Sequence, residues 1–321
     1  MKKRVRQLPY PLFFHGKPLE VSLGKMAHGG KHPVEENREK GFQQGGENMN
    51  IKRVWAVYWS ATGNTKTVVT AAAEGLAKKL DCPLSAIDFT LPAAREKGME
   101  FGPQDLVVIG TPTYAGKLPN KILPYVQEQI KGNGALAAAI VTFGNRNFDH
   151  SLAELCAVLE QNGFHTVSAG AFACRHAFTD RLAFGRPNGE DLKQAEKLAE
   201  ETAEKLLSAK EIPAPVSVPG DAAAPYYVPK GTDGQPAKFL KAKSKVDPEK
   251  CTGCKTCVNV CPMGSINPQD VSDVPGICIK CQACIRSCPD HARYFDDPAF
   301  LSHVAMLEEN FTEPKEDQLF W

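Results

Sequence analysis

The sequence lacks any run of about 18 apolar residues, which is the length that a membrane-spanning helix requires. It also lacks a large net charge: the formal value is +1, so the composition indicates neither a nucleic-acid partner nor an anionic membrane surface. The apolar stretch at residues 8–14 contains Pro9 and Pro11, and no small-residue cleavage site follows it. We therefore expect a cytoplasmic protein without a membrane span or secretory signal.

Two nucleotide-binding motifs and the usual catalytic groupings are also missing. No predicted strand is followed by G-x-G-x-x-G, and no GKS or GKT is present, so the chain has neither a dinucleotide fingerprint nor an ATP-binding P-loop. No acid–base pair or activated nucleophile stands out, so a role in substrate turnover lacks side chains to perform it. The sequence leaves open whether the protein is an enzyme and favours a carrier.

Cysteine is what the sequence has in a distinctive arrangement. Of eleven cysteines, eight form two copies of one pattern, C-x2-C-x2-C-x3-C-P, which begin at Cys251 and Cys278. This is the spacing of bacterial ferredoxins, in which the fourth cysteine of one run ligates the cluster built on the other run. The pattern predicts two [4Fe-4S] clusters. The predicted ligands of cluster one are Cys251, Cys254, Cys257 and Cys288. The predicted ligands of cluster two are Cys278, Cys281, Cys284 and Cys261.

Structural zinc and disulfides are the competing interpretations of these cysteines. Zinc sites take their ligands as two pairs, which leaves a third cysteine at the same spacing unexplained. The remaining cysteines are Cys82, Cys156 and Cys174, an odd number that does not make a disulfide framework and that fits a reducing compartment. We interpret these three as small buried hydrophobic residues.

The rest of the chain divides by composition into four segments. Residues 1–50 are basic and lack apolar periodicity, so they are predicted to be disordered or a mis-annotated extension, with translation starting at Met49. Residues 51–210 are predicted to form a folded domain. Residues 211–245 form a Pro/Lys-rich linker, which we expect to be a flexible spacer. The predicted cluster domain, residues 246–297, precedes a tail at 298–321 whose last apolar residues we expect to dock locally.

Within residues 51–210, strand-like and helix-like patterns alternate. The predicted strands are 54–59, 84–89, 106–109, 135–143 and 167–173, and the predicted helices are 64–80, 119–130, 149–162 and 189–209. The run at 106–109 is continuously apolar, as expected for a strand buried on both faces. The pattern predicts an α/β fold with a doubly wound, five-stranded parallel sheet. Ligands of such sheets bind beyond the carboxyl ends of the strands.

The loop after the first strand offers donors for a phosphate. It begins a helix and combines hydroxyls, an amide and a glycine without a lysine, as expected of an anion site at a helix N-terminus. The residues concerned are Ser60, Thr62, Gly63, Asn64 and Thr65. An ordinary Ser/Thr N-cap is the simpler alternative. Neutral donors for a phosphate monoester suggest FMN.

The loops after the third and fourth strands each place an aromatic residue among small ones. That composition suits the binding of a flat ring, whose edge can be hydrogen-bonded by backbone groups. The candidates in the earlier loop are Thr111, Pro112, Thr113, Tyr114, Ala115 and Gly116. The candidates in the later loop are Gly144, Asn145, Asn147, Phe148 and Asp149. Each aromatic taken alone is more commonly loop packing.

These motifs carry a resemblance. Residues 53–210 resemble a flavodoxin and residues 246–297 a bacterial two-cluster ferredoxin, so the chain is similar to the flavodoxin–ferredoxin fusion proteins of anaerobic bacteria. The resemblance implies a small α+β fold for the ferredoxin domain and implies that Tyr114 and Phe148 flank the flavin ring. The second cysteine run departs from the family in one respect, because it continues as Asp290-His291-Ala292-Arg293 instead of a small apolar ending. We expect this departure to loosen the packing or raise the polarity near cluster one, without removing a ligand.

The predicted function is electron transfer between FMN and the clusters, coupling two-electron to one-electron redox protein partners. A flavin-dependent NAD(P)H or quinone reductase is the first alternative, and a redox-sensing module the second. His176 follows the last strand near the expected flavin edge, but a loop histidine more commonly satisfies a carbonyl group. The pattern does not decide whether Arg146 faces the flavin or the linker.

Overall fold

The computed structural model describes residues 50–321. The predictions made for residues 1–49, including a translation start at Met49, lie outside the described residues. Every described residue belongs to one contact-defined unit of the chain. No helix within residues 50–321 is long and apolar enough to cross a membrane.

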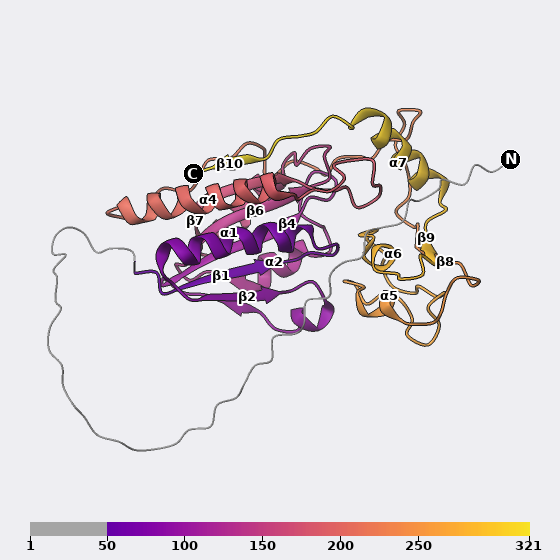
Figure 1. Cartoon of the computed structure of the whole chain (residues 1–321), viewed down its shortest axis with the longest axis horizontal. Helices are drawn as coiled ribbons and strands as arrows, with labels where there is room; N and C mark the ends of the chain where they lie inside the picture. Colours follow the sequence, from indigo (N-terminus) through magenta and orange to yellow (C-terminus); the bar gives the residue numbers. More distant parts are fainter. Residues whose placement is uncertain (1–49) are drawn as a thin grey trace, which may run out of the picture. The chain divides into compact units, whose positions relative to one another are not determined.

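A mostly parallel sheet organises the first part of the chain (Figure 1). Its strand order is β10-β7-β6-β4-β1-β2. The five parallel strands are β1 (Arg53–Tyr58), β2 (Leu84–Asp88), β4 (Asp105–Pro112), β6 (Leu136–Phe143) and β7 (His165–Ala173). Counting these five alone, the order is 2-1-3-4-5, which is the order of flavodoxin-like folds. The predicted fold class is confirmed.

The five parallel strands are those predicted, and the sheet carries a sixth, antiparallel strand that was not predicted. The additional strand, β10 (Gln318–Phe320), comes from the end of the chain and pairs antiparallel with β7. Leu319 lies opposite Gly170 and Phe320 opposite Ala169. A three-residue strand has no detectable periodicity of its own, and only its pairing with β7 makes it a strand.

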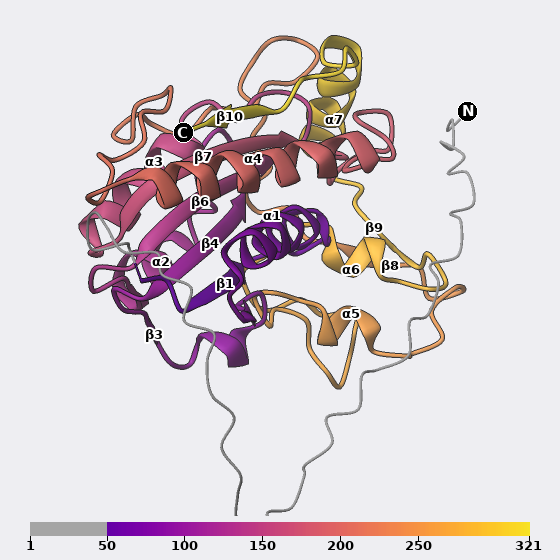
Figure 2. The ribbon, with the colours of Figure 1, turned by 60° about the vertical axis from the view of Figure 1, so that its left-hand side comes forward.

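Helices cover both faces of the sheet, as the continuous apolar strands require. On one face α1 (Asn64–Leu80) and α4 (Gly189–Ser208) lie side by side (Figure 2). On the other face α2 (Leu123–Gln129) and α3 (Ser151–Gln161) pack against a second apolar cluster. The helix predicted from residue 119 begins only at Leu123. Leu106–Ile109 is fully buried between the two layers.

Two smaller features complete this domain. The 3-10 helix η1 (Pro92–Arg95) follows β2. The strands β3 (Met99–Glu100) and β5 (Ile130–Lys131) form a separate parallel pair.

The cysteine runs lie in a region of very short elements. These are β8 (Lys245–Val246), α5 (Thr256–Asn259), α6 (Ala283–Arg286) and β9 (Arg293–Tyr294). The strands β8 and β9 pair antiparallel. The region's own apolar cluster consists of Cys257, Ile266 and Val274, while Cys281 and Ala283 join an apolar cluster of the α/β domain. Helix α7 (Pro298–Asn310) follows, with the Asp297 side chain accepting a hydrogen bond from the Phe300 N–H.

The linker differs from the expected flexible spacer, because it packs along the α/β domain. The Val216 N–H donates to the Thr166 carbonyl at 2.8 Å, and the Tyr227 N–H donates to the Ala115 carbonyl at 2.8 Å. The buried ammonium of Lys117 forms an ion pair with Glu154 at 3.0 Å and donates to the Ala224 carbonyl at 2.9 Å. Proline and lysine content identified a connecting segment, but not these hydrogen bonds.

Candidate functional site

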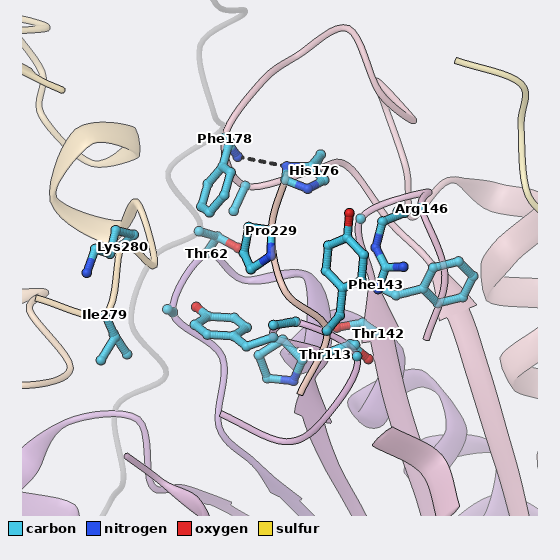
Figure 3. Close-up of a pocket in the computed structure, with 18 of the residues that line it drawn as sticks. Thr62, Thr113, Thr142, Phe143, Arg146, His176, Phe178, Pro229, Ile279 and Lys280 are labelled. Carbon is cyan, nitrogen blue, oxygen red and sulfur yellow. Dashed lines mark hydrogen bonds between the residues drawn. The ribbon is translucent and has the colours of Figure 1, made fainter. Parts of the chain in front are cut away.

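A cavity of about 690 Å³ lies at the carboxyl ends of the parallel strands (Figure 3). This is where ligands of doubly wound sheets bind, and the volume is that of a cofactor site. Of the predicted flavin-binding residues, the following line it: Thr62, Asn64, Thr65, Pro112, Thr113, Tyr114, Ala115, Gly116, Gly144 and Asn147. Six others do not line it: Ser60, Gly63, Thr111, Asn145, Phe148 and Asp149.

The first loop leaves its backbone donors available. Gly63 has φ +93°, a conformation that favours glycine, and α1 begins at the next residue. Within residues 50–321, the N–H groups of residues 61–65 have no hydrogen-bond partner. They stand at the N-terminus of a 17-residue helix, where the dipole favours an anion.

The side chains of the same loop are mostly engaged elsewhere. The Ser60 hydroxyl accepts from the Lys66 N–H at 3.0 Å, although the N-cap of α1 is Gly63 and not a Ser or Thr. The Asn64 amide donates to the Arg175 carbonyl at 3.1 Å. The Thr65 hydroxyl shares a buried hydrogen bond of 2.8 Å with Thr142. Only the Thr62 hydroxyl joins the backbone donors as an uncommitted side-chain group.

The second loop places Tyr114 at the cavity wall. Backbone hydrogen bonds between Tyr114 and Lys117 hold a tight turn, and the Tyr114 ring meets Trp59 edge to face at 5.9 Å. Burial raises the pKa of Tyr114 well above its usual value, and the neighbouring Cys281 and Cys278 raise it further. Tyr114 thus faces both the cavity and the second cysteine run. Thr111 is fully buried, and its hydroxyl has no partner among the described residues.

Three predicted contact residues of the third loop have their side chains engaged elsewhere. Phe148 is only 4% exposed and packs in the core with its centroid 5.6 Å from that of Phe143, so Phe143 lines the cavity instead. Asn145 holds the C-terminal segment: its amide donates to the carbonyls of Phe311 at 2.7 Å and Glu313 at 2.9 Å. Asp149 pairs with Arg146. These roles depend on partners that loop composition does not reveal.

Several cavity residues were not predicted, because they come from distant parts of the chain. The linker supplies Tyr226, Tyr227, Pro229, Phe239 and Leu240. Residues 277–280 come from the second cysteine run, and α7 contributes His303 and Leu307. Arg146, which the sequence left undecided, lines the cavity and also lies over the Tyr227 ring at 4.2 Å, so it faces both the cavity and the linker.

His176 lines the cavity as a neutral imidazole. Burial, together with the positive charges of Arg286 and Arg146 and the nearby His303, lowers its pKa to about 3. Its Nδ1 accepts from the Phe178 N–H at 3.1 Å (Figure 3), so the ring proton is on Nε2. The position after β7 was the signal in the sequence for this residue.

Arg286, in the second cysteine run, attaches that run to the loop after β7. Its guanidinium donates to the carbonyls of Ala177 at 3.2 Å and His176 at 2.9 Å. It also pairs with Asp180 at 2.5 Å. From the other side of the interface, Arg95 of η1 donates to the Pro262 carbonyl at 2.6 Å. The cluster domain is therefore held against the cavity edge by partly buried polar contacts.

The two cysteine runs have matching local geometry. Each short helix follows a residue in the left-handed conformation, Lys255 before α5 and Gln282 before α6. The last cysteine of each run also accepts from a backbone N–H four residues later: Ser265 to Cys261 and Ala292 to Cys288, both at 3.3 Å. Equal spacing has produced equal backbone paths.

The predicted exchange of ligands between the runs has support at cluster two. Burial raises the pKa of Cys281, and the neighbouring Cys284, Cys261 and Cys278 raise it further. Cys261 of the first run is thus among the cysteines of the second. Within residues 50–321, no three Cys, His, Asp or Glu side chains are placed to hold one common metal ion. The individual ligand assignments remain predictions.

Comparisons with known proteins agree with this division of the chain. Residues 244–267 and 275–294 each match a family described as a 4Fe-4S binding domain. A 61-residue stretch is 41% identical to the menaquinone reductase iron-sulfur cluster-binding subunit of Nitratidesulfovibrio vulgaris. That match covers 16% of this chain and 24% of the relative, so the chain spans about a quarter of the relative's length.

Solved structures similar to the chain include two flavodoxins and one oxidoreductase. An archaeal flavodoxin is 17% identical, covers 48% of this chain and 98% of its own, and has a TM-score of 0.35. Flavodoxin 2 from Bacillus cereus is 18% identical, with coverages of 48% and 99% and a TM-score of 0.36. Rubredoxin oxygen:oxidoreductase from Desulfovibrio gigas is 17% identical, with coverages of 51% and 39% and a TM-score of 0.35.

The strand order of the sheet and the two family matches define the class of protein. The chain combines a flavodoxin-like α/β domain with 4Fe-4S ferredoxin-type domains near its C-terminus. The domain matches imply two [4Fe-4S] clusters. These findings fit the resemblance to flavodoxin–ferredoxin fusion proteins that the sequence carries.

Proposed function

We propose that this protein transfers electrons between FMN and two [4Fe-4S] clusters and thereby couples two-electron to one-electron redox partners. FMN supplies one- or two-electron chemistry and each cluster one-electron chemistry, while the protein supplies binding, orientation and electrostatics. In this proposal residues 51–210 hold FMN, residues 211–245 connect the domains, and residues 246–297 hold the clusters.

The donors of the first loop support FMN as the flavin. The N–H groups of residues 61–65 and the Thr62 hydroxyl would hold a terminal phosphate at the N-terminus of α1. Tyr114 and Phe143 would border the ring, with the neutral His176 Nε2–H as an additional donor. Ser60, Thr111, Asn145, Phe148 and Asp149 would support these loops without touching the cofactor.

One observation supports electron transfer between the flavin and the clusters. Cys278, a predicted ligand of cluster two, lines the same cavity as Thr62 and Tyr114. Cofactors bound at these residues would be neighbours, so electrons would pass between them within one chain. Cluster two is then the inner cluster. Cluster one, whose predicted ligand Cys254 is exposed, would meet the redox protein partners.

The test begins with cofactor content after anaerobic reconstitution. We expect about eight iron and eight sulfide atoms and about one FMN per chain. Photoreduction of the clusters should then reduce the flavin at a rate independent of protein concentration. A content of four iron atoms, zinc in their place, FAD instead of FMN, or a concentration-dependent rate would each count against the relay.

A matched pair of variants tests the order of the clusters. Cys261→Ser should damage cluster two and slow reduction of the flavin. Cys254→Ser changes a cysteine of the same run but should damage cluster one and leave exchange between cluster two and the flavin intact. Equal effects of the two substitutions on flavin reduction would contradict the inner position of cluster two.

A reductase acting on a quinone is the second candidate, favoured by the similarity to a menaquinone reductase subunit. The cavity is lined by Phe143, Phe178 and Phe239, which suit an aromatic substrate as well as a flavin. Steady-state oxidation of NADH or NADPH with a soluble menaquinone analogue as acceptor would distinguish the two. Turnover by the reconstituted protein alone would favour the enzyme.

A further inference from the structure

Arg293 lies between the two cysteine runs. It belongs to β9 and is only 4% exposed. Its Nη1 donates to the Cys257 Sγ at 3.4 Å and to the Val271 carbonyl at 2.8 Å. Its Nη2 donates to the Ser244 hydroxyl at 2.9 Å. The guanidinium therefore contacts a predicted ligand of cluster one directly.

Ser244 extends this contact to the other run. Its hydroxyl lies 3.6 Å from the Sγ of Cys284, a predicted ligand of cluster two. Ser244 is itself only 3% exposed. One buried guanidinium is thus linked to a cysteine of each run, directly to Cys257 and through one hydroxyl to Cys284.

Among residues 50–321, no Asp or Glu side chain forms an ion pair with Arg293. Arg186, which is less buried, with 15% of its side chain exposed, pairs with both Asp191 and Asp317. A buried cation without an anionic partner is strongly unfavourable. Iron clusters held by thiolates are anionic, so the clusters themselves would provide the missing negative charge.

We propose that Arg293 is a positioning residue that raises the reduction potentials of both clusters, more strongly for cluster one than for cluster two. A fixed positive charge stabilises the electron that a cluster gains, and an N–H donated to a thiolate lowers the electron density on the sulfur. The effect reaches cluster one through Cys257 and cluster two through Ser244. This inference rests on the cluster half of the proposed function and is independent of FMN.

The experiment is a redox titration of the reconstituted, FMN-free full chain with dithionite, followed by electron paramagnetic resonance. In Arg293→Gln, the ratio of reduced to oxidised cluster one at a fixed potential should fall about tenfold, equal to about 59 mV for one electron. The same ratio for cluster two should fall about threefold, which corresponds to about 28 mV. Ser244→Ala should lower only one of the two reduction potentials. Arg293→Lys should keep both reduction potentials close to their wild-type values.

Lys245→Gln is the matched control. Lys245 lies on β8, next to the residue that pairs with Arg293, and its side chain is 59% exposed. The substitution removes the same charge from the same ribbon without touching a cysteine, so both potentials should stay at their wild-type values.

Two results would overturn the proposal: wild-type potentials in an Arg293→Gln protein that retains its iron, or an equal shift in Lys245→Gln. If the Arg293→Gln protein loses iron, the Ser244→Ala protein is the test. Two unchanged reduction potentials in that variant would reject the proposal. A wild-type protein without about eight iron atoms would reject the cluster assignment instead. Failure of flavin reduction would reject the relay and leave these potentials untouched.

Discussion

The two domains of this chain are stabilised in different ways. The α/β domain has an apolar cluster on each face of its sheet, and strand residues such as Val108 and Ile140 are completely buried. The region of the cysteine runs has only a small apolar cluster of its own, Cys257, Ile266 and Val274, and two of its elements are strands of two residues. The first domain has enough buried apolar surface to fold on that basis, while the second depends on bonds to iron.

Size explains the difference. A segment of about 50 residues buries too small a fraction of its surface to be stable through a hydrophobic core alone, and metals commonly compensate. Cysteines and residues in the left-handed conformation, such as Lys255 and Gln282, make up a large share of this segment. The comparison predicts separate responses of the two domains to the following changes.

The largest expected effect is that of removing iron. Treating the reconstituted protein with a chelator under reducing conditions should unfold residues 246–297 and leave residues 51–210 folded, because only the former depend on metal ligation. Hydrogen exchange followed by mass spectrometry would show near-complete loss of protection in the cysteine runs. Equal loss in β4 and β6 would show that the two domains are not energetically distinct.

Arg286 should give the next largest effect, at the contact between the domains. Its side chain is 11% exposed and pairs with Asp180, so Arg286→Ala should weaken the contact by about 2–4 kcal/mol. Flavin reduction by the clusters should slow, and exchange at residues 176–180 should rise. Arg181→Ala is the control: that side chain is 69% exposed and pairs with Glu308, so its loss should cost at most about 1 kcal/mol.

A smaller effect is expected from pH, within the α/β domain. His176 has its pKa lowered to about 3 by burial, so below pH 6.5 the unfolded chain takes up a proton that the folded chain refuses. The contribution of the neutral His176 ring to the free energy of unfolding is fully present above pH 6.5 and is lost as pH falls toward 3. Between pH 7.5 and 5.5 it amounts to about 1 kcal/mol.

His176→Asn should remove that dependence and keep an acceptor for the Phe178 N–H. Urea unfolding followed by tryptophan fluorescence at the two pH values would measure it. Between the two pH values, the free energy of unfolding should change less in the variant than in the wild type. An identical change in both proteins would show that His176 is not the group responsible.

The smallest effect is expected from a comparison of the two cysteine runs with each other. Gly264 and His291 occupy equivalent positions, each three residues after the last cysteine of its run, with φ of +58° and +49°. The left-handed conformation is costly for histidine, so His291→Gly should stabilise the cluster domain by less than about 1 kcal/mol. Thermal loss of the visible cluster absorbance would report it.

Gly264→Ala is the reciprocal change and should destabilise the domain by a similar amount. An added Cβ there would meet only the Pro92 Cγ, at an ordinary 3.6 Å, so the variant reports backbone conformation rather than crowding. Stabilisation by Gly264→Ala would contradict the equivalence of the two positions.

Local patterns in the sequence were sufficient for much of this description. The alternation of apolar runs and amphipathic segments predicted the parallel sheet, because strand and helix periodicity is set by residues close together in the chain. The spacing of the cysteines predicted two clusters for the same reason. Available N–H groups at the start of α1 followed from the loop at Ser60–Thr65.

What the tertiary structure decided involves partners far apart in the chain. Asn145 was predicted to bind flavin but holds the carbonyls of Phe311 and Glu313, and Phe148 enters the core. The linker packs on the α/β domain, and β10 joins its sheet. Arg293 was identified in the sequence only as a departure from the family pattern, and its place between Cys257 and Ser244 came from the fold. Periodicity and spacing report which local structure a segment forms, but side-chain contacts depend on which distant segment packs against it.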